Sequence, residues 1–192
     1  MWNAIRQSFW MLAIFTILTG IVYPLGMTGL AQLLFPDQAN GSLLMREGKV
    51  VGSKLIGQGF SSPGYFQGRP SAAGESGYDA ASSAGSNLGP TSQKLKQVVT
   101  ERVEAVRQQN ALDGGAVIPG DLVLASASGL DPHISPAAAY LQIERVAKAR
   151  GVSTAQLQTL VMQHTEGPQL AIFGAARVNV LMLNLALDSS KR

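Results

Sequence analysis

The sequence predicts a single N-terminal transmembrane α-helix followed by a mixed α/β extracytoplasmic domain. Two observations carry this prediction. Only 14% of the 192 residues are charged, against roughly a quarter in an ordinary soluble domain, and no charged residue lies between Arg6 and Asp37. After this uncharged run, short apolar stretches alternate with Gly-, Ser- and Pro-rich segments and with capped helical patterns, which is typical of a mixed domain.

The uncharged run is long enough to cross a membrane. About 20 apolar residues span a bilayer core of about 30 Å. We therefore predict a transmembrane helix over residues 9–35, with residues 1–8 before it and a domain over residues 36–192. Gly29-Leu30-Ala31 resembles a signal-peptidase site, but the apolar stretch before it exceeds the roughly 7–15 residues of a signal h-region. An uncleaved anchor is the better interpretation.

The charges that flank the span predict its orientation. Arg6 lies in the short N-terminal flank, whereas the first basic residue after the span is Arg46. Positively charged flanks stay on the cytoplasmic side, so the N-terminus is expected in the cytoplasm and the domain outside. The sequence thus predicts a single-pass protein of the cell inner membrane, in contact with lipid.

Small residues gather on one face of the predicted span. Ala13, Thr16, Gly20 and Pro24 follow one another at steps of three or four, which places them on one side of a helix. Small residues allow a second membrane helix to approach closely, so this face is predicted to contact a partner. The alternative is that Gly and Pro are simply commoner in membrane helices.

The predicted domain begins with strands and a long loop. Residues 42–45 and 49–51, joined across Glu47-Gly48, are expected to form a β-hairpin. The Gly/Ser/Ala/Pro-rich segment 67–90 is expected to be a long loop, either functional or partner-bound, or a surface excursion. Alternating or continuous apolar residues predict further strands over 121–125 and 178–187.

Three helices are predicted from their capping residues. They span residues 91–110, 135–150 and 153–164. Thr91 is the expected cap of the first helix, and Ser135 caps the second, with a proline at the first helical position. Gly151 is expected to end the second helix in a left-handed conformation, and Ser153 with Gln156 forms a capping box for the third.

Composition and motifs exclude several function classes. The net charge is only +3 despite a pI near 9.4, and the basic residues are scattered, so no nucleic-acid partner is expected. The chain has no cysteine, and His133 and His164 do not form an HExxH pattern, so no metal cofactor is expected. The sequence also lacks a GxxxxGK[ST] phosphate loop, a DKTG phosphorylation sequence and a TVGYG-like filter.

A nucleophilic site remains the alternative from another class. Ser126, Ser128, Asp131 and His133 supply the residue types of a Ser–His–Asp hydrolase, here a membrane-anchored exported one. The serines do not occur in a GxSxG elbow, however, and nothing in the sequence positions the base. The residues alone therefore favour an accessory subunit over an enzyme.

Several motifs occur together in one order. They lie at residues 38–42, 65–72, 85–88, 126–131, 145–150 and 178–180. In order and spacing they resemble the C subunit of the bacterial Kdp potassium-transporting P-type ATPase, and the resemblance covers essentially the whole chain.

The resemblance implies a division of labour among subunits. In that family a channel-like A subunit selects potassium, a P-type B subunit hydrolyses ATP, and a small F subunit stabilises the assembly. The C subunit is implied to be non-catalytic, to assist assembly and to raise the ATP affinity of the B subunit as a catalytic chaperone. A further hypothesis is that its outer domain caps or regulates the potassium entrance.

The resemblance also implies that ATP is bound through Gln142. The predicted topology instead places Gln142 outside the cell, where ATP is scarce. A single glutamine without a phosphate cradle on a helix is more often a surface residue.

Overall fold

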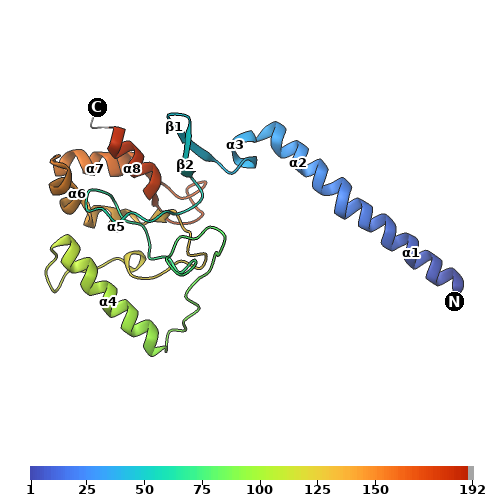
Figure 1. Cartoon of the computed structure of the whole chain (residues 1–192), viewed down its shortest axis with the longest axis horizontal. Helices are drawn as coiled ribbons and strands as arrows, with labels where there is room; N and C mark the ends of the chain where they lie inside the picture. Colours follow the sequence, from blue (N-terminus) through green and yellow to red (C-terminus); the bar gives the residue numbers. More distant parts are fainter. Residues whose placement is uncertain (190–192) are drawn as a thin grey trace. The chain divides into compact units, whose positions relative to one another are not determined.

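The structure is a computed structural model that describes residues 1–189 and comprises two compact units, Met1–Val51 and a unit that begins at Gly52 (Figure 1). It confirms the predicted fold class, because one long apolar N-terminal helix precedes a domain of helices with small sheets. The last three residues of the predicted domain, 190–192, lie outside the described residues.

The first unit is dominated by the apolar helix, which is long and apolar enough to cross a membrane. Its segments are α1 (Trp2–Ile17), the π-helical η1 (Leu18–Val22) and α2 (Tyr23–Leu34). The π-helical stretch lies where Pro24 interrupts the usual pattern, because its ring nitrogen has no hydrogen to donate to the Gly20 carbonyl. The Tyr23 N–H correspondingly bonds the Leu18 carbonyl, five residues back.

A short helix and a hairpin follow the apolar helix. Their bounds are α3 (Pro36–Ala39), β1 (Leu43–Arg46) and β2 (Lys49–Ser53). Glu47 and Gly48 join the two strands with φ values of 52° and 75°, which is the left-handed pair that a two-residue hairpin turn needs. The predicted hairpin is confirmed, and its second strand is two residues longer than expected.

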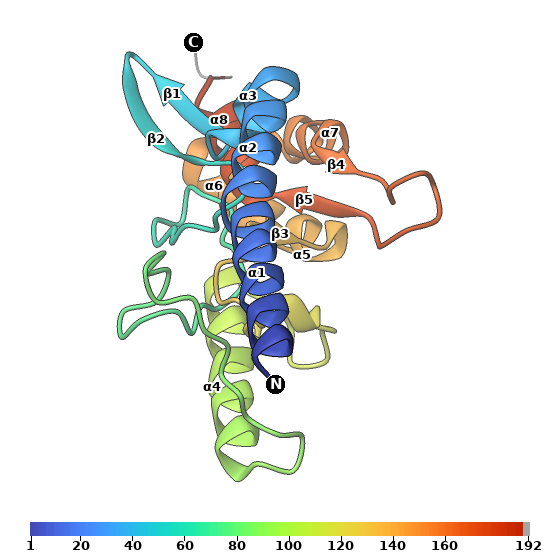
Figure 2. The ribbon, with the colours of Figure 1, turned by 90° about the vertical axis from the view of Figure 1, so that its right-hand side faces the viewer.

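The second unit contains a small antiparallel sheet with strand order β3-β5-β4 (Figure 2). The strands are β3 (His133–Ile134), β4 (Thr165–Glu166) and β5 (Arg177–Asn179). Val178 is the central residue, since it pairs with Ile134 on one side and with Thr165 on the other, and it is fully buried. The sheet thus joins β3 to the hairpin of β4 and β5, which lies well after it in the sequence.

The second unit also contains helices and one 3-10 turn. They are α4 (Gln93–Asn110), the 3-10 turn η2 (Gly120–Leu122), α5 (Pro136–Leu141), α6 (Ile143–Arg150), α7 (Thr154–Gln163) and α8 (Val180–Ser189). The Ser135 cap, the Ser153–Gln156 capping box and the left-handed Gly151 are all confirmed. The N-cap of α4 is Ser92 and not the predicted Thr91, because the Ser92 hydroxyl accepts a hydrogen bond from the Leu95 N–H.

The strand predicted over 178–187 is wrong beyond Asn179. The Asn179 side chain accepts a hydrogen bond from the Met182 N–H, which starts α8. The run that follows is rich in leucine, and its buried members Val180, Leu183 and Leu187 recur at helical spacing. A run this uniformly apolar fits both the alternation of a strand and the periodicity of a helix. The Asn179 cap favours the helix.

The strand predicted over 121–125 is also wrong. The segment begins with the η2 turn, in which Leu122 N–H bonds the Pro119 carbonyl. Its later carbonyls accept hydrogen bonds from arginines instead of from a neighbouring strand, as at Val123, which pairs with Arg102 at 2.9 Å. Arginine side chains thus replace the strand partner that the prediction required.

The long loop runs in the structure over residues 54–92, beyond the predicted 67–90, and contributes to the core instead of lying over the surface. The buried cluster is built mainly from α5, α6, α7 and α8, yet Phe66 in the loop is fully buried within it. No helix or strand is formed between Ser53 and Gln93. Polar side chains of the helices, described below, therefore hold this segment in place.

Candidate functional site

Gln142 lies at a break between α5 and α6. Its side-chain nitrogen donates to the Ala138 carbonyl at 3.2 Å, and its own N–H bonds the Ala139 carbonyl instead. Such back-bonding onto the preceding turn bends a helix. The predicted helix over 135–150 is consequently two helices, and Gln142 is only 1% exposed rather than on the surface.

Two buried amides hold the loop by imitating a β-ladder. Gln142 Oε1 accepts from the Gln67 N–H at 2.8 Å, and Gln142 Nε2 donates to the Gln67 carbonyl at 3.1 Å. Asn184 does the same for Phe66, with both bonds at 2.9 Å. Consecutive loop residues thus receive the paired hydrogen bonds that a neighbouring strand would provide.

Arg145 extends this network to α4 and to the start of the loop. Its guanidinium donates to Gln142 Oε1 at 2.7 Å and to Asn110 Oδ1 at 3.0 Å. It also donates to the carbonyls of Pro63 and Tyr65, at 2.6 and 3.0 Å. Burial lowers the pKa of Arg145 from its ordinary value. One half-buried cation therefore ties α6, α4 and the loop together.

The hydrogen-bonding capacity of Gln142 is used up by these contacts. Its oxygen accepts from Gln67 and Arg145, and its nitrogen donates to Gln67 and Ala138. An amide offers two acceptor sites and two donors, so none remains for a ligand. Contact between a nucleotide and Gln142 would first require this network to open, and that contact stays a prediction.

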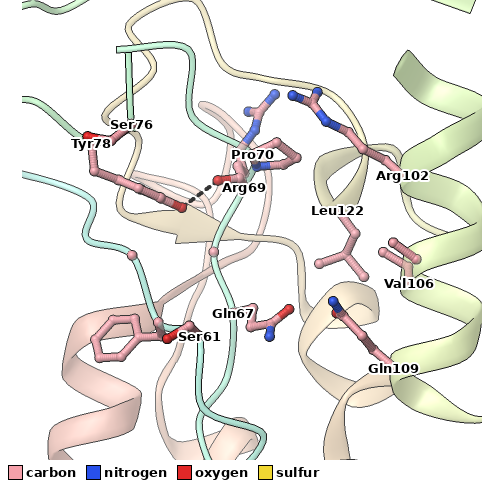
Figure 3. A pocket seen from close by; sticks show the side chains of 14 residues that line it. Ser61, Gln67, Arg69, Pro70, Ser76, Tyr78, Arg102, Val106, Gln109 and Leu122 are labelled. Atoms are coloured by element: carbon pink, nitrogen blue, oxygen red, sulfur yellow. Dashed lines mark hydrogen bonds between the residues drawn. The ribbon is translucent and has the colours of Figure 1, made fainter. Parts of the chain in front are cut away.

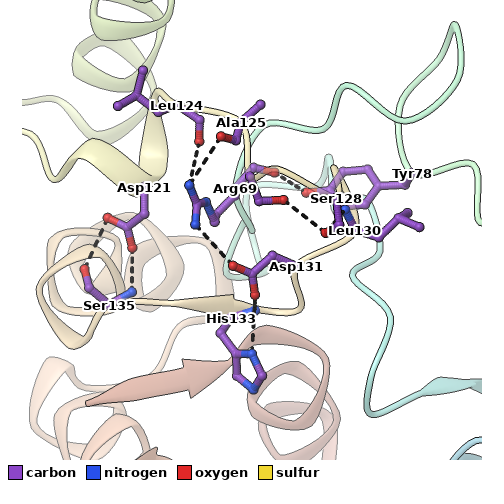
Figure 4. Close-up of polar contacts among 11 residues, drawn as sticks. Arg69, Tyr78, Asp121, Leu124, Ala125, Ser128, Leu130, Asp131, His133 and Ser135 are labelled. Atoms are coloured by element: carbon purple, nitrogen blue, oxygen red, sulfur yellow. Dashed lines mark hydrogen bonds and ion pairs between the residues drawn. The ribbon is translucent and has the colours of Figure 1, made fainter. Parts of the chain in front are cut away.

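A second polar cluster joins the loop to the segment before β3 (Figure 4). Asp131 pairs with Arg69 at 3.1 Å, and its other oxygen lies 3.4 Å from His133 Nδ1. The side-chain hydrogen bond from His133, followed by the His133 backbone N–H and the charge of Arg69, lowers the pKa of Asp131 from its ordinary value. Arg69 also reaches the carbonyls of Leu124 and Ala125, both at 3.4 Å.

The residues considered for a hydrolase do not form a nucleophile–base pair. The His133 ring faces Asp131, whereas Ser128 Oγ accepts a hydrogen bond from the Leu130 N–H at 3.1 Å. Ser126 Oγ lies 3.4 Å from Ser128 Oγ. Within residues 1–189, no group of three or more His, Asp or Glu side chains could hold a metal ion. The serines thus shape a turn and have no base beside them.

An open pocket of about 540 Å³ lies between the loop and α4 (Figure 3). Arg69 and Arg102 lie at one side of it, and Gln67 and Gln109 at the other. The Tyr78 hydroxyl donates to the Arg69 carbonyl at 2.5 Å, and burial raises its pKa, with a smaller effect from the Asp131 charge. The lining offers cations and neutral groups, and Gln142 is not among them.

The small-residue face lies in the first unit. The apolar helix contains all four residues, Ala13, Thr16, Gly20 and Pro24. The most apolar stretch of this helix has no buried residue. A side chain added at Gly20 would meet nothing within 4 Å. The face is available to a partner, and contact with one stays a prediction.

The side chains that hold the loop were not predicted from the sequence. Arg145, Asn110 and Asn184 were not expected to hold it. For Asn184 a signal exists, since it is a single amide inside an apolar run, and a buried amide needs hydrogen-bond partners. For Arg145 and Asn110 the pattern is indistinguishable from that of exposed helix residues.

Acid is expected to weaken the Asp131 cluster. Because its folded pKa lies below the ordinary 3.8, the Asp131 carboxylate stabilises the fold above that pH, and the contribution is lost as pH falls through the folded value. Asp131→Asn should therefore lower stability at pH 7 and show a smaller further loss on acidification below about pH 4. Thermal unfolding from pH 7 to pH 3 measures both effects, and parallel curves for the two proteins would contradict the assignment.

Comparison with known proteins places these features in a family context. A family model described as "K+-transporting ATPase, c chain" matches residues 5–189. The chain is 55% identical over 191 residues to a potassium-transporting ATPase KdpC subunit of Polaromonas naphthalenivorans, covering 98% of this chain and 96% of the relative. KdpC subunits of Gemmatimonas aurantiaca (56% over 191 residues, 98% and 94%) and Mycobacterium tuberculosis (55% over 178 residues, 93% and 94%) are similar.

Proposed function

The chain belongs to the family of the c chain of the K+-transporting ATPase, and on that premise we propose that it is a non-catalytic accessory subunit. In this role it assists assembly of the complex and raises the ATP affinity of the ATP-hydrolysing subunit. The observation that supports it most is the use of buried polar groups. The buried Gln142, Asn184 and Asn110 and the half-buried Arg145 hold backbone or one another, and so tie the long loop to the helices of the domain.

The effect on ATP is proposed to be indirect. Gln142 is buried and fully hydrogen-bonded, and the proposed topology keeps it on the outer side of the membrane. A subunit that binds only one conformation of a partner shifts that partner toward it, and so changes its ligand affinity from a distance. We therefore attribute the higher ATP affinity to contacts with the other subunits, without nucleotide held by this chain.

The domain is proposed to act at the outer entrance for potassium. Arg6 before the span supports a cytoplasmic N-terminus, which places the unit beginning at Gly52 outside. The partners are proposed to be the channel-like A, ATP-hydrolysing B and small F subunits. A domain beside the entrance would regulate how potassium reaches the selective path.

Sidedness is testable with single cysteines, because the chain has none of its own. Gln142 is too buried to be labelled in the folded protein, whereas Val117 is 89% exposed. Val117→Cys should react with a membrane-impermeant maleimide in intact cells, and Asn3→Cys should react only after the membrane is opened. The reverse pattern would contradict the proposed orientation.

A larger side chain on the small-residue face should impair assembly. Gly20→Leu adds a side chain that would meet nothing in this chain but would obstruct a helix seated against this face. We expect less of the large subunits to co-purify with the tagged variant than with the unmodified chain. Val22→Leu, on another side of the helix, is the matched control. Equal recovery for the two variants would contradict the proposed face.

One purification distinguishes the accessory subunit from the membrane-anchored hydrolase. A tagged chain extracted in mild detergent should bring with it two large polytopic proteins and a potassium-stimulated ATPase activity, both identified by mass spectrometry and assay. The membrane-anchored hydrolase is favoured instead if the chain purifies alone, cleaves an ester or peptide substrate and loses that activity on Ser128→Ala.

A further inference from the structure

The connection between β4 and β5 extends as a loop beyond the two strands (Figure 2), and its tip is apolar. We define the apolar tip as Leu170, Ala171, Ile172 and Phe173. Leu170, Ile172 and Phe173 are 84%, 78% and 64% exposed. Three neighbouring large apolar side chains in water at one loop tip are a cluster, which differs from the scattered exposed residues of an ordinary surface.

The backbone holds these side chains outward. Gln169 and Phe173 exchange backbone hydrogen bonds at 2.8 and 2.9 Å, so the tip closes a hairpin beyond the paired ends of β4 and β5. Leu170 and Ala171 take φ values of 51° and 60°, a region that disfavours residues with a side chain. A turn that is closed by its own backbone hydrogen bonds loses less conformational entropy on binding than an open loop would.

The charge around the tip indicates what covers it. Residues 167–176 contain no charged residue, and the flanking Glu166 and Arg177 pair with each other at 3.1 Å. Segments that lie on a lipid surface usually carry Lys, Arg, Trp or Tyr beside their apolar residues, and this segment has none. The centres of protein–protein interfaces are, by contrast, depleted of charge and often anchored by an aromatic side chain.

We propose that the apolar tip is an anchor that inserts into an uncharged apolar pocket on another subunit of the K+-transporting ATPase. The inference depends only on the chain being a subunit of that complex, and holds for either orientation of the domain. Burial of side chains of this size typically strengthens association by on the order of 10-fold or more each.

Cross-linking of the assembled complex tests the proposal. Ile172→Cys with a benzophenone attached to its thiol is expected to cross-link to another subunit. In a separate preparation without the benzophenone, the free thiol should react with maleimide far more slowly in the complex than in the free chain. Val117→Cys is the matched control, since Val117 is also highly exposed but lies outside the apolar tip. Cross-links only to lipid, only to a second copy of this chain, or no protection of the thiol would each overturn the proposal.

A second variant checks the contribution to affinity. Replacement of Leu170, Ile172 and Phe173 by serine removes the anchor without touching the buried core. We expect the thermal unfolding of the free chain to be unchanged, and its retention by the complex to weaken by at least about tenfold. Undiminished retention of the folded variant would overturn the proposal.

Discussion

Gln142→Ala is expected to lower the free energy of unfolding by about 3 kcal/mol or more, because it leaves several buried groups without partners. The Gln67 N–H and carbonyl lose both of their bonds, and the Arg145 guanidinium loses an acceptor at 2.7 Å. An unpaired buried group costs more than the net value of the bond that it made. The loop should therefore open locally before the rest of the domain unfolds.

Two measurements on the full chain in detergent test this expectation. Thermal unfolding should shift down by roughly 10 °C, and the backbone amides of Phe66 and Gln67 should lose their protection from hydrogen exchange. Gln109→Ala, at an exposed position on α4, is the control and should change stability by less than about 0.5 kcal/mol. Direct nucleotide contact is indicated instead if Gln142→Ala leaves stability unchanged but abolishes photolabelling of this chain by an ATP analogue.

Gly129→Ala is expected to destabilise the domain by about 3 kcal/mol as well, for a steric reason. Gly129 has a φ of +67°, and a Cβ there would lie 2.4 Å from the Ala84 carbonyl oxygen and 2.8 Å from the Ala73 nitrogen. Both contacts are with backbone of the long loop, which cannot move aside as a flexible side chain would. The variant must displace the loop or distort the turn before β3.

The matched control for this variant is Gly115→Ala. A Cβ at Gly115 would meet nothing within 4 Å, and its φ is not in the left-handed region. Calorimetric unfolding of the two full-length variants should show a large loss for Gly129→Ala and little or none for Gly115→Ala. Equal stabilities would mean that the loop does not pack against this turn.

Elements whose signals are local were predictable from the sequence. The apolar run, the Glu47-Gly48 turn, the Ser135 cap and the Ser153–Gln156 capping box each depend on residues within a few positions of one another, and all are present. Where two periodicities fitted one apolar run, as in 178–187, the sequence did not separate strand from helix. There the Asn179 cap, which stabilises the first turn, decided the outcome.

The organisation of the loop was not predictable, because its partners are distant in the sequence. Gln67 and Gln142 are 75 residues apart, and Phe66 and Asn184 are 118 apart. Side-chain amides that replace a β-ladder leave no periodic pattern in either segment. The loop's own Gly- and Ser-rich composition resembles that of a solvated excursion, although its conformation is specified by buried groups elsewhere.

Release of the domain from an assembled complex tests the central proposal most directly. A protease site inserted between Asn40 and Gly41, in the turn between α3 and β1, allows the hairpin and the domain to be removed after assembly. Potassium-stimulated ATP hydrolysis is then measured before and after cleavage, with an uncut complex treated identically as the control. We predict that the apparent potassium affinity falls several-fold while the large subunits stay together and still hydrolyse ATP. An unchanged potassium affinity in an intact complex without the domain would contradict the proposal.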